Sequence, residues 1–531
     1  MQACHLLILC AATLLPLLDS AATGQLQAAD AAPDRPNVVF ILADDLGWGE
    51  VGCFGQEKIP TPNIDRLATR GIKLTRHYSG APTCAPSRCV LMTGKHLGHA
   101  EIRGNQQAKV LIPQFTEGQH PLSKESVTLA QEFERAGYAT GAFGKWGLGP
   151  IGSTGEPNRK GFDEFFGYNC QAIAHSYFPK SLWKNRVSVL LNEAPIPGHK
   201  KQPEGDVLLE TYQGKKYAPQ EILGAATAFI EAHRTQPFFL YLPFIEPHVA
   251  MQPPPKLLER FPKEWDDRVY RGEGGYLPHP RPRAAYAAMI HDLDDHVGQV
   301  VATLEKAGLL EKTLIVFTSD NGATHDSASE YFHVGGADPV FFNSTRGLRG
   351  YKGSIYEGGL RVPAIVAWPG TIAPGQICEA PTYFPDWFPT LCEAANIPQP
   401  EGLDGTSLLP LLTGKSPAGP LERQTPMVWV YAEYTGQVCV RLGDFKILRR
   451  GLKTRNPQPW EVYNIADDES ETTNLAESRP DLITEAIKIL SDQTSPNDVF
   501  PMPDCDTKVG LVPEQPTRAK KAAKADKATI P

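Results

Sequence analysis

Four polar segments follow stretches of this sequence that have the pattern of buried strands. They are Asp44 and Asp45, Lys145, His248, and Asp320 and Asn321. In a parallel sheet, ligands bind outside the carboxyl ends of the strands, so these side chains are predicted to meet at one edge. Each segment also has an ordinary structural reading, because polar residues at strand ends often begin a turn. Their convergence on one edge is the informative feature.

The carboxylate and amide members of this set supply only oxygen ligands. They are Asp44, Asp45, Asp320 and Asn321. Oxygen ligands suit a hard cation such as Ca²⁺ or Mg²⁺, and no histidine-rich set indicates zinc. Lys145, Lys352 and Arg88 add positive charge to the same site, in a chain whose formal charge is -8. Such a site predicts an oxyanion ester as the substrate.

Residues 84–94 form a further candidate segment, because they combine a cysteine with a neighbouring arginine. The pattern predicts a loop that enters a helix with Ser87 near its N-terminus, where backbone amides and the helix dipole favour anions. A reactive thiol at Cys84 would fit beside Arg88.

These residues need a scaffold of alternating strands and helices. Apolar strands are predicted at residues 37–42, 138–143, 238–242, 314–318 and 362–368. Helices are predicted at residues 61–68, 126–136 and 286–304, the first with Thr61 as N-cap and Pro62 at N1. This alternation predicts an α/β fold with a mainly parallel sheet covered on both faces.

The pattern changes near residue 395. Strands at residues 438–442 and 445–448 are joined by Gly443 and Asp444, which is typical of a hairpin, and a helix is predicted at residues 481–490. We therefore expect a catalytic domain at residues 35–395, a smaller α+β subdomain at 396–500 and a flexible basic tail at 515–531.

Composition excludes some classes of function. The chain has 531 residues and 41% hydrophobic content, and its acidic balance argues against a sequence-independent nucleic-acid binder. No apolar run reaches the ~18 residues of a membrane span. The apolar run from Leu6 to Leu18, followed by small residues, predicts a signal peptide at 1–29 and export to the periplasm or outside the cell. The alternative is an apolar helix of the core.

At residues 84–94 the sequence resembles the type I sulfatases, in which Cys-x-Pro-Ser-Arg followed by Thr-Gly directs conversion of the cysteine to Cα-formylglycine. Here the segment reads Cys84-Ala85-Pro86-Ser87-Arg88, with Thr93 and Gly94 behind it. The other landmarks stand in the family's order at residues 43–47, 61–65, 144–146, 318–322 and 352–359. The resemblance runs from about Arg35 to past residue 490.

This resemblance implies an alkaline-phosphatase-like fold with a small C-terminal subdomain, and a separate enzyme that converts Cys84. It implies that one Ca²⁺ is held by Asp44, Asp45, Asp320, Asn321 and residue 84. Residue 84, as the formylglycine hydrate, would attack sulfur, with Asp320 as the candidate base. Arg88 would steady the hydrate, Lys145 and Lys352 would bind sulfate oxygens, and His248 would assist the leaving oxygen.

The sequence departs from the family at Gly147, where similar sulfatases commonly carry a histidine that supports the formylglycine hydroxyl. Two further stretches, residues 96–105 and 171–179, look similar to secreted bacterial sulfatases that act on sulfated sugars. The substrate residues they indicate are His96, His99, Arg103 and His175. A carbohydrate sulfate, such as a galactose-type 4-sulfate, is the expected substrate, and an aryl or lipid sulfate stays open.

Two other functions remain as hypotheses. One is a phosphate or phosphonate ester hydrolase of the same superfamily, because sulfate and phosphate monoesters share size and geometry. The other is a non-catalytic protein that binds sulfated glycans, with Cys84 left as a thiol or paired with another cysteine. Eight cysteines remain after removal of the signal peptide, so conversion of Cys84 leaves an odd number and at least one unpaired within the chain.

Overall fold

A computed structural model describes residues 35–324, 334–415 and 421–503. The predicted signal peptide and basic tail lie outside the described residues. From Pro36 onward the described chain belongs to one compact unit. None of the described helices combines the length and apolar composition needed to cross a bilayer.

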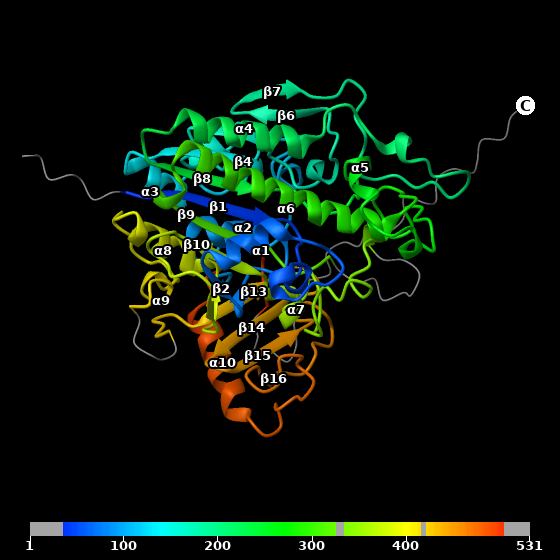
Figure 1. The fold of residues 1–531 in the computed structure, drawn as a ribbon. Coiled ribbons are helices and arrows are strands. Elements are labelled where there is room, and N and C mark those ends of the chain that lie inside the picture. The colour runs from blue at the N-terminus through cyan, green and yellow to red at the C-terminus, as the bar shows by residue number, and fades with distance from the viewer. Residues whose placement is uncertain (1–34, 325–333, 416–420, 504–531) are drawn as a thin grey trace, which may run out of the picture. The chain divides into compact units, whose positions relative to one another are not determined.

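A ten-stranded sheet forms the centre of this unit (Figure 1). Its order is β11 (Gln376–Cys378), β2 (Ile72–Leu74), β10 (Ala364–Ala367), β9 (Thr313–Ser319), β1 (Asn37–Ala43), β8 (Phe238–Pro243), β4 (Ala139–Lys145), β5 (Glu164–Tyr168), β6 (Ser181–Lys184) and β7 (Val187–Leu190). The five central strands β9, β1, β8, β4 and β5 run parallel to one another. Strand β10 runs antiparallel to both β9 and β2, and β6 and β7 are antiparallel at the other end. The predicted mainly parallel sheet is confirmed.

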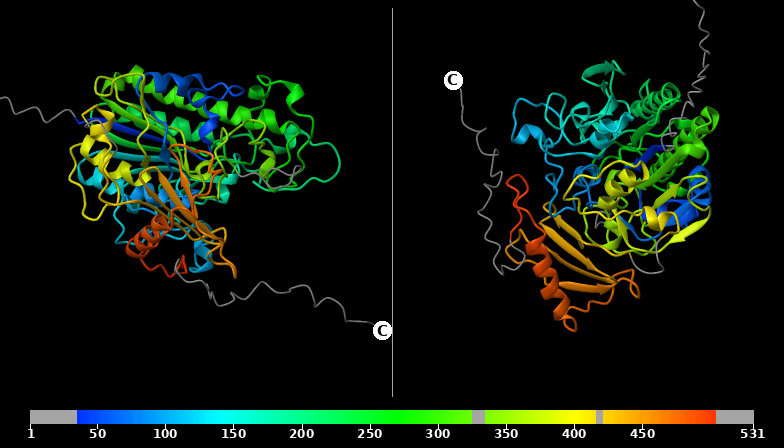
Figure 2. Two further views of the ribbon diagram at one scale, coloured as in Figure 1. Left: turned by 90° about the horizontal axis from the view of Figure 1, so that it is seen from below. Right: turned by 90° about the vertical axis from the view of Figure 1, so that its left-hand side faces the viewer.

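Strand β1 divides the core into two layers, because its successive side chains point to opposite faces. Val38, Phe40 and Leu42 pack in one cluster with α2 (Cys84–Thr93), α3 (Leu129–Arg135) and α8 (Trp387–Ala394). Val39 and Ile41 pack in the other cluster with α1 (Pro62–Thr69), α4 (Ala218–Ala232) and α6 (Pro282–Ala307). Helices therefore cover both faces of the sheet, as the alternation predicted (Figures 1 and 2).

Element ends differ from the predictions by a few residues. The helix predicted at 126–136 is α3, which starts at Leu129 because the Thr128 side chain accepts a hydrogen bond from the Gln131 amide and caps it. Helix α6 is longer than predicted, since it begins at Pro282 and ends at Gly308 in a left-handed conformation. The strand predicted at residues 362–368 is β10, which is shorter and spans Ala364–Ala367.

The chain after α8 builds a second, smaller sheet. Strands β13 (Met427–Tyr431), β14 (Gln437–Leu442), β15 (Phe445–Arg450) and β16 (Glu461–Asn464) are antiparallel in this order. Helix α10 (Pro480–Asp492) packs on this sheet through Leu482, Ala486 and Leu490 (Figure 2). Gly443 has a φ of +57° in the turn between β14 and β15, so the predicted hairpin is confirmed.

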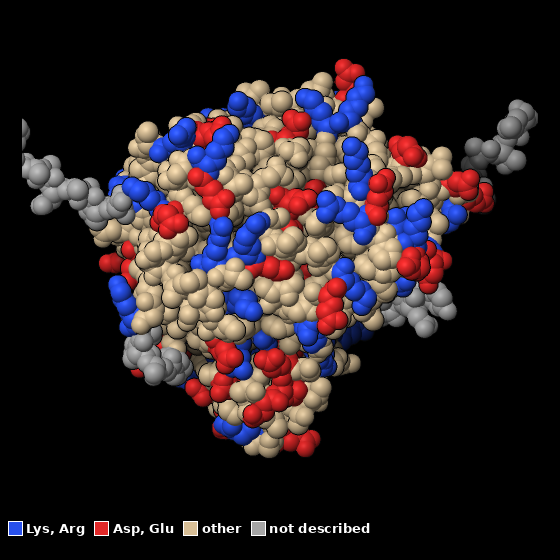
Figure 3. Space-filling model, in the orientation of Figure 1, with Lys and Arg blue, Asp and Glu red and all other residues tan. Residues whose placement is uncertain are grey.

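The remaining elements are short. They are β3 (His77–Tyr78), paired with β12 (Thr382–Tyr383), and the helices α5 (Pro255–Leu258), α7 (Glu357–Leu360) and α9 (Leu409–Leu412). On the face drawn in Figure 3, basic and acidic side chains lie interspersed. All seven cysteines in the described residues are free thiols.

A buried ion cluster joins the small sheet to α7, and we name it the bridging cluster. It consists of Tyr78, Glu357, Lys446 and Glu471. The Lys446 ammonium lies 2.9 Å from a Glu357 oxygen and 3.0 Å from a Glu471 oxygen. The Tyr78 hydroxyl donates to Glu357 at 2.8 Å, and the Glu357 amide donates to Glu471 at 2.7 Å. The cluster thus ties together four segments that are distant in sequence.

Candidate active site

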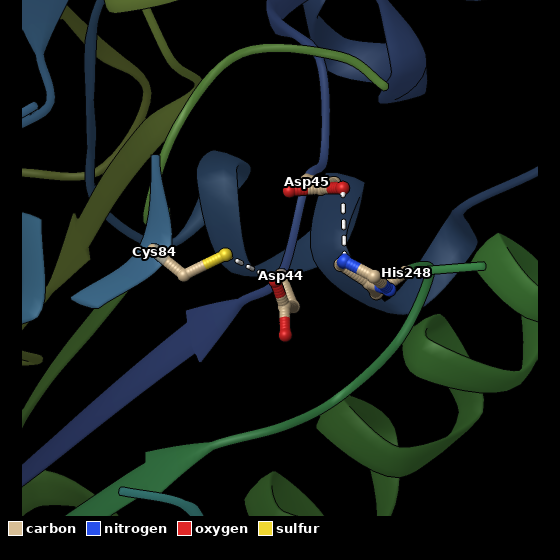
Figure 4. Close-up of side chains that lie close together, drawn as sticks. All are labelled: Asp44, Asp45, Cys84 and His248. Atoms are coloured by element: carbon tan, nitrogen blue, oxygen red, sulfur yellow. Dashed lines mark hydrogen bonds and ion pairs between the residues drawn. The ribbon is translucent and has the colours of Figure 1, made fainter. Parts of the chain in front are cut away.

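The polar residues predicted at strand ends do meet at one edge of the central sheet. With the side chains that contact them they form what we call the strand-end cluster: Asp44, Asp45, Cys84, Arg88, Lys145, His248, Asp320, Asn321 and Lys352. Asp44 and Asp45 directly follow β1, and Asp320 directly follows β9. Because Ala43 pairs with Ser319, the two strands end side by side, and the Asp320 amide donates to the Ala43 carbonyl at 3.0 Å. Lys145 is the last residue of β4, and His248 follows β8. Figure 4 shows the side chains from β1, α2 and the β8 loop turned toward one another.

Asp45 is held in an uncommon backbone conformation. Its φ of +67° lies in the left-handed region, which a non-glycine residue adopts only when its surroundings fix it. The Asp45 backbone amide donates to an Asp320 oxygen at 3.2 Å. The Asp45 carboxylate accepts a hydrogen bond from the side-chain Nδ2 of Asn321 at 2.8 Å. These contacts aim the Asp45 carboxylate into the cluster.

Cys84 is the first residue of α2, which places Ser87 in the first helical turn, near the N-terminus as the sequence predicted. The Cys84 sulfur lies 3.5 Å from an Asp44 oxygen, and the residue is only 3% exposed (Figure 4). Burial raises the pKa of the Cys84 thiol to about 12, although Lys145 and Lys352 oppose this rise. An unmodified Cys84 is therefore a neutral, weak nucleophile at neutral pH.

Arg88 and Lys145 neutralise the carboxylates from within the core. The Arg88 guanidinium donates twice to one Asp320 oxygen, at 3.0 and 2.8 Å, and also bonds to the Lys145 carbonyl. The Lys145 ammonium lies 2.5 Å from an Asp44 oxygen. Burial alone would raise the pKa of Asp44, but the charges of Lys145 and Arg88 lower it. Asp44 is thus an anion held by buried cations.

Asp320 behaves differently from Asp44. Burial and the nearby Asp44 charge raise the pKa of Asp320 to about 6, although Arg88 lowers it. The site therefore combines a strongly acidic carboxyl and a weakly acidic one within the same cluster.

Lys352 and His248 form the other side of the site. The Lys352 ammonium lies 2.7 Å from an Asp45 oxygen and 3.2 Å from His248 Nε2. His248 Nδ1 bonds to the Val249 carbonyl oxygen, so the proton of the neutral ring is on Nδ1 and Nε2 is an acceptor. Burial and the Lys352 charge hold the pKa of His248 well below its usual range.

The donor set fits a hard cation. Asn321 Oδ1 is buried and has no hydrogen-bond partner, and a buried acceptor without a partner costs about 1–3 kcal/mol. Ligand atoms of Asp44, Asp45, Cys84 and His248 all lie within 4.8 Å of one another. Three carboxylates and three basic side chains balance in charge, so a bound divalent cation would leave the site net positive, as an anionic ester needs.

The predicted substrate residues fall into two groups. His175 lies in the site, because its ring stacks on His248 with centroids 4.8 Å apart and planes 9° apart. His96 and His99 instead stack on each other, and His99 bonds to Asp404 at 2.9 Å.

Arg103 is buried in the same region as His96 and His99. Its guanidinium donates to the carbonyl groups of Ala100, Gly98 and Ser495. The structure thus gives His96, His99 and Arg103 protein partners and brings only His175 to the strand-end cluster.

Sequence reasoning missed several residues around the site. His199 bonds to His175 at 2.9 Å, and Tyr276, with a φ of +65°, stacks on His199 with ring centroids 4.4 Å apart. Asn105 accepts from the Ala85 amide at the start of α2, at 2.9 Å. Asn105 lies within residues 96–105, which the sequence already indicated as a substrate stretch. His199 and Tyr276 lie in loops that carry no recognisable motif.

The small sheet also reaches the site. The Gln437 side chain donates to the Gly353 carbonyl at 2.7 Å and accepts from the Ile355 amide at 3.3 Å, which fixes the loop that carries Lys352. Glu433 accepts from the Asn105 amide at 2.8 Å. Positions of this kind are set by packing between distant segments and have no local sequence signal.

Comparison with protein families agrees with this geometry. Residues 36–397 match the family described as Sulfatase, and residues 350–493 match the family described as N-sulphoglucosamine sulphohydrolase, C-terminal. Arylsulfatase A of Homo sapiens is 33% identical over 429 residues, which span 77% of this chain and 74% of that protein. Steryl-sulfatase of Mus musculus is 30% identical over 439 residues, which span 72% of this chain and 66% of that protein.

Solved structures show the same fold. The crystal structure of Ps i-CgsB in complex with k-i-k-neocarrahexaose has a TM-score of 0.68 and 26% identity, and covers 86% of this chain and 92% of that one. The phosphonate monoester hydrolase of Agrobacterium radiobacter has a TM-score of 0.60 and 20% identity, and covers 86% of this chain and 96% of that one. These likenesses confirm the predicted alkaline-phosphatase-like architecture.

Proposed function

The chain belongs to the sulfatase family, and on this premise we propose that it hydrolyses sulfate esters at residue 84, in a reaction that needs one Ca²⁺ and conversion of Cys84 to Cα-formylglycine. The observation that carries the proposal is the position of Cys84. It lies at the first turn of α2, 3.5 Å from Asp44, in a cluster that also holds Arg88 and two lysines.

Asp44, Asp45, Asp320, Asn321 and residue 84 would hold the Ca²⁺. The cation would supply Lewis acidity and favour the deprotonated form of a hydroxyl at residue 84. Formylglycine would supply a hydrated aldehyde in place of a thiol whose pKa of about 12 makes it a poor nucleophile.

The basic side chains bind the sulfate group. Lys145 and Lys352 each lie on a carboxylate of the proposed metal site, at 2.5 and 2.7 Å. When a cation occupies those carboxylates, the two ammonium groups are free to turn to sulfate oxygens, which need the same donors. Arg88 is fully buried and paired with Asp320, so it fixes the carboxylate and stays in place.

His248 is placed to carry a proton to the leaving oxygen. Its Nδ1–H is anchored on the Val249 carbonyl, so the ring presents Nε2 to the site. The Lys352 ammonium, 3.2 Å away, donates a hydrogen bond to Nε2 and keeps its own proton, because its pKa is raised well above its usual range. When Lys352 turns to sulfate, Nε2 would take the proton that a hydroxyl at residue 84 loses and pass it to the leaving oxygen. This arrangement leaves the leaving group as an alcohol.

A sulfated carbohydrate, such as a galactose-type 4-sulfate, is the proposed substrate. His175 and Tyr276 place aromatic rings beside His248, and aromatic rings with polar edges suit a hydroxyl-rich ring. The structural relative Ps i-CgsB was crystallised with k-i-k-neocarrahexaose. We also infer that the protein is exported, from the apolar run at Leu6 to Leu18.

The test is sulfate release by protein made together with a formylglycine-generating enzyme. The peptide that contains residue 84 is first checked by mass for the aldehyde, and sulfated galactose, an aryl sulfate and an aryl phosphate are then compared with and without a Ca²⁺ chelator. Cys84→Ala should abolish sulfate release, whereas Cys89→Ala, at a second buried thiol of α2, serves as the matched control. Faster phosphate than sulfate hydrolysis, or full activity of Cys84→Ala, would overturn the proposal.

A further inference from the structure

The Gln171 side chain is a buried amide without a partner. The residue is 5% exposed, and neither its Oε1 nor its Nε2 has a hydrogen-bond partner. Leaving such a group unpaired costs about 1–3 kcal/mol, so we expect the amide to take a partner that the folded chain does not itself supply.

Gln171 lies in the loop that follows β5, next to β4, the strand that ends at Lys145. Strand β5 ends at Tyr168, which pairs with Lys145 at the end of β4, and both strands point their carboxyl ends at the same edge. The backbone N–H of Gln171 donates a hydrogen bond to Gln119 Oε1 at 2.8 Å, which fixes the loop after β5. The same loop delivers His175 to His248.

The Gln171 side chain fills the space next to Gly147. A Cβ atom built on Gly147 would lie 1.9 Å from Gln171 Nε2, and Gly147 has a φ of +79°. Any side chain at position 147 would therefore displace the amide. The absence of a side chain at Gly147 therefore leaves the space that the Gln171 amide occupies.

We propose that the Gln171 amide binds a hydroxyl group in the catalytic centre. This inference rests on the proposed function. The amide leaves both a donor group and an acceptor unused, and a hydroxyl group can satisfy both because it donates and accepts. A sulfate oxygen only accepts, so it would leave Oε1 unpaired.

The hydroxyl has two possible sources, which differ in their dependence on the substrate. One is a hydroxyl of the sugar beside the sulfate ester. The other is a hydroxyl of hydrated formylglycine at residue 84. An aryl sulfate without hydroxyl groups distinguishes them, because it lacks the first source and retains the second.

The test is Gln171→Leu, which keeps the volume of the side chain and removes its polar atoms. Because the amide has no partner in the protein, the melting temperature should stay the same or rise. The kcat/KM for a galactose sulfate should fall by about tenfold or more, the loss expected when a buried hydrogen bond to a ligand is removed. An equal fall with the aryl sulfate assigns the hydroxyl to residue 84, and a fall for the sugar alone assigns it to the substrate.

Gln252→Leu is the matched control for stability. The Gln252 amide is also buried, but it accepts from the Tyr177 amide at 3.0 Å and donates to the Tyr212 carbonyl at 2.8 Å. The same substitution there should lower the melting temperature. If Gln171→Leu lowers it to the same extent, the Gln171 amide has partners in the protein and the proposal is wrong.

Gly147→Ala tests the same amide from the other side. Its Cβ should push the Gln171 amide away and reduce kcat/KM, and the φ of +79° should add backbone strain that lowers the melting temperature with or without the amide. The kcat/KM of the double variant Gly147→Ala/Gln171→Leu should not fall below that of the less active single variant. Additive losses, or an unchanged kcat/KM for both substrates in Gln171→Leu, would overturn the proposal. Failure of the matured parent to release sulfate would count against the proposed function instead, and it is measured before any variant.

Discussion

The strand-end cluster and the bridging cluster are both buried sets of opposite charges, but they use their cations differently. In the bridging cluster one buried ammonium, from Lys446, lies between two buried carboxylates and contacts both. In the strand-end cluster Lys145 and Lys352 each lie on a separate aspartate, beside an asparagine oxygen that has no partner. Separate ion pairs beside an unused ligand atom are what the proposed cation and sulfate site requires, whereas the shared ammonium of the bridging cluster only holds segments together.

Removing one charge from the strand-end cluster should have the largest effect. Asp45→Asn keeps the shape of the side chain but removes the anion that contacts Lys352 and faces the proposed cation. Sulfate release should fall by about 10³-fold, since a preorganised electrostatic group at a reacting centre has this weight. Stabilisation of the fold by added Ca²⁺, measured as a rise in melting temperature, should shrink as well. Unchanged turnover would remove Asp45 from the site.

Removing the cation of the bridging cluster should cost folding stability and leave the chemistry intact. Lys446→Ala leaves Glu357 and Glu471 buried without their shared partner, and breaking a buried ion pair in this way costs about 3–5 kcal/mol. Urea unfolding measures the loss. Lys488→Ala, which breaks an exposed pair with Asp492, is the control and should change little. Equal stability of both variants would contradict a structural role for the cluster.

The pH dependence of stability should carry the signature of the bridging cluster. Burial raises the pKa of Glu471 from 4.5 to about 7, although Lys446 lowers it. The folded state therefore binds this proton more tightly, so its contribution to stability is present below about pH 4.5 and is lost as the pH rises toward 7. Glu471→Gln should flatten the unfolding free energy over this window. An identical slope in parent and variant would assign the dependence to other groups.

The smallest effect is expected outside both clusters. His99→Ala removes hydrogen bonds to the partly buried Asp404, which should cost about 1–2 kcal/mol of stability. The KM for a galactose sulfate should stay within about twofold, whereas His175→Ala, beside His248, should raise it. A matching rise in both variants would restore His99 as a substrate residue.

The sequence predicted the parts of the site that depend on strand order. Asp44, Asp45, Lys145 and Asp320 follow strands that could be recognised by their apolar runs, and parallel pairing brings such ends together whatever the loops do. The antiparallel direction of β10 was not predictable from its composition, because its apolar run is the same in either direction.

Residues that reach the site through long-range packing could not be predicted. Gln437 fixes the Lys352 loop from a different sheet, and Gln171 acquires its position from the absence of a side chain at Gly147. His96 and His99 were predicted as substrate residues from their sequence context, and their contacts with Asp404 could not be predicted from that context.

The burial of Cys84 sets an order of events in the life of the chain. At 3% exposure, behind Asp44 and at the first turn of a helix whose residues are all buried, the thiol is out of reach of another enzyme once the fold has formed. Under the proposed function, its oxidation to an aldehyde has to occur while residues 84–94 are still extended and accessible. Under the same proposal, a chain that folds with its thiol intact would stay inactive until it unfolds again.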